Sequence, residues 1–167
     1  IGAGYVGLTA AAVYAKLGHT VFAVRKDADK VEMLKRGEVP FFESGLPELV
    51  KEQVEAGRLI PTISYAEAVP SAEVIFLCVG TPPLPSGEAD LSQVFAAAKE
   101  VVENFGNEYK VIVNKSTVPV GTAEKVQKVI KESFVTRSQS RGDLATNQFD
   151  MASCPEFLRE GSAVADT

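Results

Sequence analysis

The feature that most restricts the fold of this chain is its first stretch, Ile1 to Leu8, which reads I-G-A-G-Y-V-G-L. Glycines spaced as G-x-G-x-x-G are typical of a strand that turns tightly into a helix. Gly2 permits the turn, Gly4 lets a pyrophosphate approach the backbone, and Gly7 lets the helix pack closely on the sheet. Phosphates would then bind the free N–H groups at the positive end of the helix. The stretch predicts a dinucleotide site formed by Gly2, Gly4, Tyr5, Val6 and Gly7.

The residues that follow supply the context that the motif needs, because the same glycine spacing also occurs in ordinary loops. Apolar residues recur at helical spacing up to Leu17, and Gly18 is a left-handed helix stop. The run Thr20 to Val24 is β-branched and aromatic, as in strands. The order strand, glycine turn, helix and strand within about 30 residues is that of a dinucleotide-binding βαβ unit.

Strands and helices alternate along the rest of the chain. The apolar run 72–79 suits a parallel strand buried on both faces, whereas the possible strand 59–64 is weakened by Pro61. We predict an α/β fold with a doubly wound parallel sheet, a Rossmann-type dinucleotide-binding domain. The polar stretch 137–148 predicts a mobile surface loop. Further strands are predicted at 110–114 and 149–153, and helices at 28–36, 46–56, 91–105 and 123–134.

The length, charge and cysteine content of the chain exclude several classes of binding partner. A length of 167 residues predicts one domain over 1–167, and the formal net charge of −5 without a basic run argues against nucleic acid and anionic membranes as partners. No apolar run approaches the roughly 20 residues of a membrane helix. The two cysteines, Cys78 and Cys154, have no metal-ligand spacing, so we expect no metal site and a reducing, cytoplasmic location.

The two ends of the sequence suggest that the chain is part of a longer protein. It begins without Met, at the last residue of what should be the central strand, so that strand is truncated. It stops soon after a helix start, at 165–167. We therefore expect any activity to need residues beyond this sequence.

Ligands of open α/β sheets bind outside the carboxyl ends of the strands. That rule selects the glycine turn and the segments 25–30, 79–83 and 116–118, which we expect to form one crevice. The segment 156–160 should lie near it if the last strand is parallel.

Five stretches in this order resemble the motifs of the nucleotide-sugar dehydrogenases, the UDP-glucose/GDP-mannose dehydrogenase family, and within it most resemble the UDP-glucose 6-dehydrogenases. They are residues 2–8, 78–82, 87–91, 115–122 and 155–161. The resemblance implies oxidation of UDP-glucose to UDP-glucuronate in successive NAD-dependent steps, through a thiohemiacetal and a thioester on a cysteine. That cysteine belongs to a downstream catalytic domain absent here, so we expect this chain alone to be inactive.

The resemblance also implies residue roles. Thr117 would hold the catalytic water or a substrate oxygen, Glu156 would act as general acid or base, and Glu160 would contact the nicotinamide end of the cofactor. Residues 154–167 would begin the substrate-binding segment, in which Glu156, Phe157, Leu158 and Arg159 bind the nucleotide sugar. Other residues expected to line the cofactor site are Val79, Thr81, Pro82 and Ser116, together with Thr117 and Glu160.

The chemistry is reasonable without the family. Loss of hydride from an alcohol requires a base for its proton, and a carboxylate can serve. Glu156 and Glu160 are four residues apart, so on a helix they would share a face. Spacing alone equally fits two solvated carboxylates at a helix start.

The end of the second predicted strand departs from the family, which has an acid there for the adenosine ribose. This chain has Arg25, which can instead neutralise a 2'-phosphate, so NADP is an alternative to the expected NAD. Otherwise Arg25 stacks on adenine or faces solvent, and Asp27 or Asp29 takes the ribose. Lys30 would lie near the ribose of either cofactor.

Alternatives remain open at the level of function. The substrate could be GDP-mannose or a UDP-aminosugar, and the chain could be a non-catalytic dinucleotide-binding module. Neither Cys78 nor Cys154 is expected to be the nucleophile. A homodimer is expected only for the full-length protein.

Overall fold

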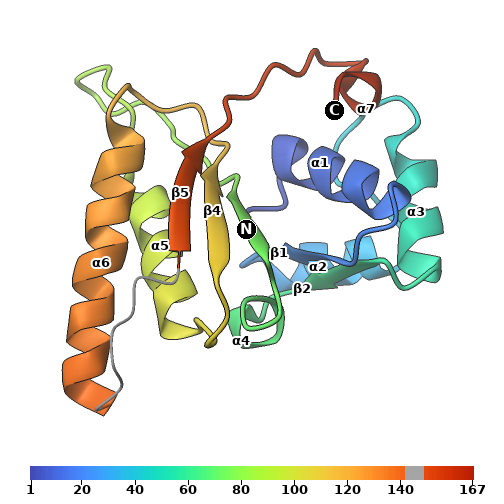
Figure 1. Cartoon of the computed structure of the whole chain (residues 1–167). Coiled ribbons are helices and arrows are strands. Elements are labelled where there is room, and N and C mark those ends of the chain that lie inside the picture. Colours follow the sequence, from blue (N-terminus) through green and yellow to red (C-terminus); the bar gives the residue numbers. More distant parts are fainter. Residues whose placement is uncertain (142–148) are drawn as a thin grey trace. The chain divides into compact units, whose positions relative to one another are not determined.

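The computed structural model describes residues 1–141 and 149–167 (Figure 1). These residues form two compact units, the first made of Ile1–Ser64 with Glu156–Thr167 and the second of Tyr65–Pro155. In chain order the elements are α1 (Tyr5–Lys16), β1 (Val21–Val24), α2 (Ala28–Lys35), α3 (Leu46–Glu55), β2 (Leu59–Thr62), α4 (Tyr65–Ala68), β3 (Val74–Leu77), α5 (Ser92–Glu103), β4 (Lys110–Asn114), α6 (Thr122–Arg141), β5 (Phe149–Ser153) and α7 (Ala163–Asp166).

The first unit is organised around two parallel strands, β1 and β2, with Val21 opposite Leu59. Pro61 lies within β2, opposite Ala23, so the predicted strand exists despite its proline. Among the described residues β2 pairs with β1 alone, so the proline interrupts no second ladder there.

The glycine turn is joined to β1 by backbone hydrogen bonds. The N–H of Gly2 donates to the carbonyl oxygen of Val24 at 2.9 Å, at the carboxyl end of the strand. Leu8 of α1 and Leu34 of α2 are fully buried in the core of this unit. Burying side chains of this size is worth about 1.5–3 kcal/mol each, so the core fixes the helix that follows the turn.

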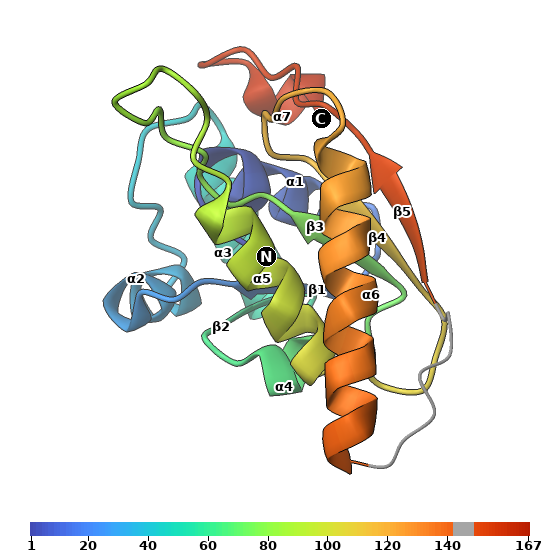
Figure 2. The same ribbon diagram turned by 90° about the vertical axis from the view of Figure 1, so that its left-hand side faces the viewer.

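The second unit contains a parallel sheet of three strands in the order β3, β4, β5. Helices α5 and α6 lie side by side on one face of this sheet (Figures 1 and 2). Ile112 in the central strand and Val94 in α5 are fully buried. The predicted alternation of strands and helices with parallel pairing is therefore confirmed, and so is the α/β class.

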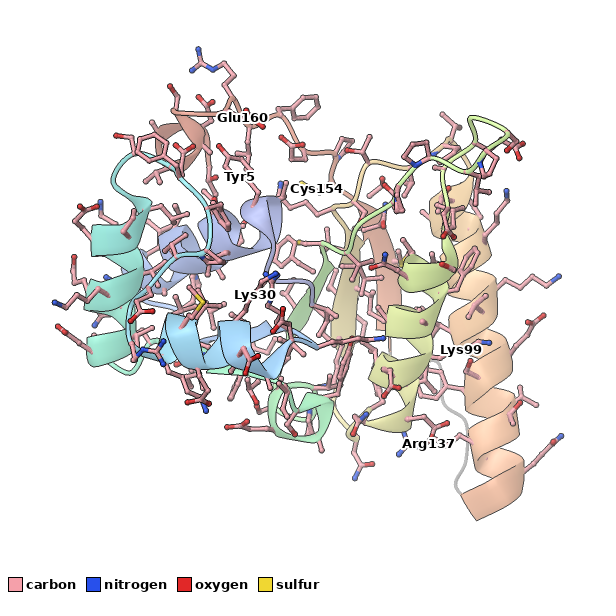
Figure 3. The ribbon with its side chains drawn as sticks, turned by 180° about the vertical axis from the view of Figure 1, so that it is seen from behind. Tyr5, Lys30, Lys99, Arg137, Cys154 and Glu160 are labelled. Carbon is pink, nitrogen blue, oxygen red and sulfur yellow. The ribbon has the colours of Figure 1, made fainter. Side chains whose placement is uncertain are left out.

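One prediction about the boundary of α6 is wrong. The helix extends to Arg141, five residues into the stretch 137–148 that was expected to be a loop. The guanidinium of Arg137 donates from Nη1 to the carbonyl oxygens of Val102 at 2.6 Å and Phe105 at 3.0 Å, which ties this turn of α6 to the end of α5 (Figure 3). Residues 142–148 lie outside the described part of the chain.

In the described ranges no helix has the length and apolar character needed to cross a membrane. Nor do those ranges contain a cluster of three or more His, Cys, Asp or Glu side chains arranged to hold a metal ion.

Candidate functional site

The glycine turn has the geometry of a phosphate cradle. Gly2 has a φ of 93°, a conformation that a side chain would disfavour. The N–H of Gly4 donates to the carbonyl oxygen of Gly2 at 2.8 Å, which closes the turn. A Cβ added to Gly4 would meet no described atom within 4 Å, so the space in front of this residue is open.

Helix α1 begins directly after Gly4, which is its N-cap residue. No side chain makes a capping hydrogen bond at this end of the helix, and the first turn contains no acidic residue that would balance the positive end of the helix dipole. The N–H groups of Tyr5, Val6 and Gly7 lie in this turn, where a helix offers no carbonyl acceptors. Free N–H groups and the positive end of the helix dipole together favour an anion. This end of α1 therefore suits a pyrophosphate.

Arg25 follows β1 and turns back to the glycine turn. Its Nη1 donates a short hydrogen bond to the carbonyl oxygen of Ala3, and its backbone N–H donates to Thr62 O at 3.0 Å. Its Nε is buried without an acceptor among the described residues. A buried donor without a partner costs about 1–3 kcal/mol, so an oxygen of a bound ligand would relieve this cost.

Asp27 and Lys30 are already engaged with each other. Asp27 is the N-cap of α2, and its carboxylate accepts the backbone N–H of Lys30 at 3.1 Å. The Lys30 ammonium lies 3.3 Å from the other Asp27 oxygen. The hydrogen bond from the Lys30 backbone is the main cause that lowers the pKa of Asp27. Asp27 and Asp29 are the two acids expected near the ribose. Asp27 is used as the cap of α2, whereas Asp29 does not cap this helix and is exposed.

In the second unit, the carboxyl ends of β3 and β4 are bonded together. The Ser116 hydroxyl donates to Val79 O at 2.8 Å, and the Thr81 hydroxyl donates to Thr117 O at 2.8 Å. These bonds fix the backbone around Thr117 while its side chain remains exposed. The structure therefore brings together the four predicted residues Val79, Thr81, Ser116 and Thr117.

Asn114 was not predicted as a site residue. It ends β4, is 1% exposed, and donates from Nδ2 to Ser116 O at 3.2 Å. Its carbonyl oxygen accepts the N–H of Cys154 at 3.0 Å, so it links the ends of β4 and β5. Its Oδ1 is buried without a donor in the part of the chain that the structure describes.

The segment after β5 is not helical between Pro155 and Gly161, so the condition under which Glu156 and Glu160 would share a helix face is not met. Gly161 has a φ of 85°, a left-handed conformation that does not occur within an α-helix, and α7 begins only at Ala163. The Glu156 carboxylate instead accepts a short hydrogen bond from the N–H of Leu158. Because β5 is parallel to β4, the segment does leave from the carboxyl edge of the sheet, as expected.

Arg159 and Phe157, both expected to bind the nucleotide sugar, differ in how they are held. The guanidinium of Arg159 donates to Asp166 at 3.0 and 2.6 Å, and its backbone N–H donates to the same carboxylate at 3.1 Å. Phe157 is 82% exposed. Arg159 is therefore held by Asp166, whereas the Phe157 side chain is exposed to solvent.

Tyr5 and Glu43 form a hydrogen-bonded pair of ionisable side chains in the first unit. The Tyr5 hydroxyl donates a short hydrogen bond to Glu43, a carboxylate that is 1% exposed. Burial first, and then the bond to Glu43, raises the pKa of Tyr5 to about 12, and the same bond is the main cause that lowers the pKa of Glu43. No sequence motif pointed to Glu43, because its partners lie far away in the chain.

Both cysteines are free. Cys78 is half-buried directly after β3, and burial raises the pKa of its thiol, which disfavours the reactive thiolate. Cys154 is exposed directly after β5.

The residues present fit a dinucleotide on observations of this structure alone. Gly4 faces open space, the start of α1 presents uncapped N–H groups, and Arg25 holds a buried donor without an acceptor. That the glycine turn and the edge of β3 and β4 line one crevice stays a prediction.

Comparison with known proteins agrees with this geometry. The chain is 46% identical over 166 residues to a UDP-glucose 6-dehydrogenase of Pseudomonas aeruginosa, covering 99% of this chain and 35% of that protein. A solved UDP-glucose dehydrogenase from Pyrobaculum islandicum superposes with a TM-score of 0.86 at 39% identity, covering 99% of this chain and 37% of that one. A GDP-mannose dehydrogenase from Pseudomonas aeruginosa gives a TM-score of 0.85 at 32% identity, with the same coverage of 99% and 37%.

The chain thus spans about a third of the length of the relatives that it matches, and the fold is that of their N-terminal Rossmann-type domain. The family model of the NAD binding domain matches residues 1–167. The chain therefore belongs to the UDP-glucose/GDP-mannose dehydrogenase family of NAD-dependent nucleotide-sugar dehydrogenases, as their NAD-binding part.

Proposed function

We propose that this chain binds NAD for the oxidation of UDP-glucose to UDP-glucuronate in successive NAD-dependent steps. The observation that carries the proposal is the uncapped start of α1 behind an open Gly4, a cradle built for a pyrophosphate. The choice of sugar nucleotide rests on the relatives, among which the UDP-glucose enzymes have the higher identities, 46% and 39% against 32% for the GDP-mannose enzyme.

NAD, when bound, accepts the hydride from the sugar alcohol. The residues of this chain would bind and orient the cofactor and take up the proton that the alcohol releases. Glu156 is our candidate for that base, and Thr117 for the residue that holds a water or substrate oxygen. Thr117 is suited to this task because Thr81 fixes its backbone while its hydroxyl stays exposed.

The remaining predicted contacts divide between cofactor and substrate. Glu160 would contact the nicotinamide end, while Phe157, Leu158 and Arg159 would bind the nucleotide sugar. Because Asp166 already neutralises Arg159, we expect Arg159 to act through its donors that stay free rather than as an unpaired charge.

We favour NAD over NADP because Arg25 is committed to the glycine turn. A residue that reads a 2'-phosphate needs its guanidinium free for a bidentate contact. Here one Nη1 hydrogen is used by Ala3 O, which holds the guanidinium against the glycine turn, and Nε is buried without an acceptor among the described residues.

A domain exchange tests the catalytic part of the proposal. Residues 1–167 replace the matching part of the Pseudomonas aeruginosa UDP-glucose 6-dehydrogenase, and NADH formation is followed with UDP-glucose, GDP-mannose and a UDP-aminosugar. We expect NADH with UDP-glucose, and loss of it in the chimera carrying Thr117→Ala. No NADH is expected from the 167-residue chain alone.

Two results would contradict the proposal. A folded, NAD-binding chimera that oxidises GDP-mannose or the aminosugar instead would reassign the substrate. A folded chimera that binds NAD and oxidises none of the sugars would favour a non-catalytic dinucleotide-binding module.

A further inference from the structure

The Glu43 carboxylate is buried and accepts hydrogen bonds from three donors. Oε2 accepts the Tyr5 hydroxyl and the N–H of Gly161, the latter at 2.7 Å, and Oε1 accepts the N–H of Ala163 at 2.9 Å. Gly161 and Ala163 are 118 and 120 residues away in the sequence. A buried charge is stable only when such partners surround it, so the three donors account for its presence.

The backbone of Glu43 and the ring of Tyr5 are themselves held by neighbouring residues. It lies in the loop between α2 and α3, and its carbonyl oxygen accepts the N–H of Leu46 at 3.2 Å, at the start of α3. The neighbouring Phe41 ring packs on Tyr5, with 5.3 Å between the ring centroids. The carboxylate therefore sits on a rigid support, because both the backbone of Glu43 and the Tyr5 ring are packed.

The donors come from the two segments that the proposed function assigns to the cofactor. Tyr5 is the first residue of α1, in the glycine turn, and Gly161 directly follows Glu160. Oε2 of Glu43 accepts hydrogen bonds from both Tyr5 and Gly161, so the backbone next to Glu160 is held at the glycine turn. Figure 3 shows Tyr5 at the start of α1 and Glu160 on the segment next to it.

We propose that Glu43 is a positioning residue, which holds the segment 159–163, and with it Glu160, beside the phosphate-binding turn. What the held segment does for the cofactor rests on the proposed function, but the holding itself does not. A carboxylate is suited to the task because it accepts on both oxygens. A glutamine of the same size has one acceptor oxygen and turns an NH₂ group toward N–H donors, so it cannot serve all three.

Hydrogen exchange followed by NMR tests the proposal on the 167-residue chain. In the Glu43→Gln variant we expect the amides of Gly161 or Ala163 to exchange about tenfold faster or more, since hydrogen bonds to charged groups are among the strong ones. Core amides such as that of Ile112, in the other unit, should exchange as before. The matched control is Glu48→Gln, the same change at an exposed position in the first turn of α3.

Calorimetric titration with NAD gives the second readout. We expect weaker NAD binding by Glu43→Gln and parent-like binding by Glu48→Gln. Tyr5→Phe removes one donor and leaves both amide bonds to Glu43, so Gly161 and Ala163 should stay protected in it. If Glu43→Gln does not fold, Glu43→Asp takes its place, because it keeps the charge and loses the reach.

Unchanged exchange at both Gly161 and Ala163 in the folded variant would overturn the proposal. Faster exchange with unchanged NAD affinity would also overturn it, because the segment would then be held without consequence for the cofactor. If the parent chain binds no NAD, the proposed function fails, while the exchange rates still decide whether Glu43 holds the segment.

Discussion

The Nη1 of Arg25 donates a hydrogen bond to the carbonyl oxygen of Ala3, 22 residues earlier in the chain. The bond ties the end of β1 to the glycine turn, at the position where the family has an acid. Arg25 is thereby part of the support of the turn, and its Nε is buried without an acceptor among the described residues.

Replacing Arg25 should therefore weaken NAD binding rather than change cofactor preference. We expect Arg25→Met, which keeps the length of the side chain, to reduce NAD affinity about tenfold, the effect of one charge-assisted hydrogen bond. Titration calorimetry measures this effect, with the exposed neighbour Lys26→Met as control. An Arg25→Met chain that binds NAD as tightly as its parent would show that Arg25 faces no part of the cofactor.

A side chain at Gly4 should abolish cofactor binding without unfolding the chain. Gly4 has a φ of −85°, which any residue can adopt, and nothing described lies within 4 Å of an added Cβ. Gly4→Val would fill the space of the pyrophosphate, and we expect at least a loss of about 100-fold in NAD affinity, since both helix N–H contacts and phosphate approach are blocked.

Gly57→Ala is the reciprocal control for Gly4→Val. Gly57 has a φ of 69°, so a side chain there is strained and should lower the free energy of unfolding by about 1 kcal/mol. NAD affinity should not change. Weak NAD binding by both variants, or a Gly4→Val chain that fails to fold, would show that the loss reflects stability rather than the cradle.

Replacing Lys110 should lower the free energy of unfolding without any direct effect on the candidate site. Its side chain is fully buried, its Nζ donates to Pro70 O at 2.8 Å and Ala72 O at 2.7 Å, and it lies 5.3 Å from the centroid of the Phe105 ring. Lys110→Met keeps the volume but leaves both carbonyls without this donor, which should cost about 2 kcal/mol. Urea unfolding measures it, with Lys99→Met on the exposed face of α5 as control, and equal midpoints for the two variants would refute the prediction.

The pair of Glu43 and Tyr5 should make stability depend on pH at both ends of the scale. The pKa of Glu43 is lowered in the folded chain, so the unfolded chain binds more protons in acid, and the stabilisation is lost as pH falls through the folded pKa. The pKa of Tyr5 is raised from 10.0 to about 12, so its contribution is present below the lower value and is lost as pH rises through the upper one. Burial of Glu43 and, to a smaller extent, the charge of Asp166 oppose the lowering of its pKa without reversing it.

Urea unfolding of the parent chain and of Glu43→Gln as a function of pH tests this dependence. The parent should be the more stable at pH values between the two transitions, and the difference should shrink below about pH 4, where an ordinary glutamate is protonated. A difference that stays constant from neutral pH to pH 3 would mean that folding does not shift the pKa of Glu43.

The fold could be predicted because its signals are local. The glycine turn, the helical spacing of α1 and the apolar run of β3 are each contained in a few neighbouring residues, and the alternation of such segments leaves few topologies. The edge formed by Thr81, Ser116 and Thr117 followed from the rule that ligands bind at the carboxyl ends of parallel strands.

The parts that could not be predicted depend on partners distant in sequence. Glu43 looks like a solvated loop residue until Gly161 and Ala163 arrive beside it. The extra length of α6 depends on Arg137 reaching the end of α5. The spacing of Glu156 and Glu160 is compatible with a helix, but could not show that no helix forms there.

The most direct measurement is a calorimetric titration of the 167-residue chain with NAD and, separately, with NADP. We predict binding of NAD and weaker binding of NADP, because the chain belongs to an NAD-dependent family and Arg25 is held against the glycine turn by its bond to Ala3. A folded chain that binds neither cofactor would contradict the central claim. Tighter binding of NADP, abolished by Arg25→Asp, would contradict the assignment of NAD.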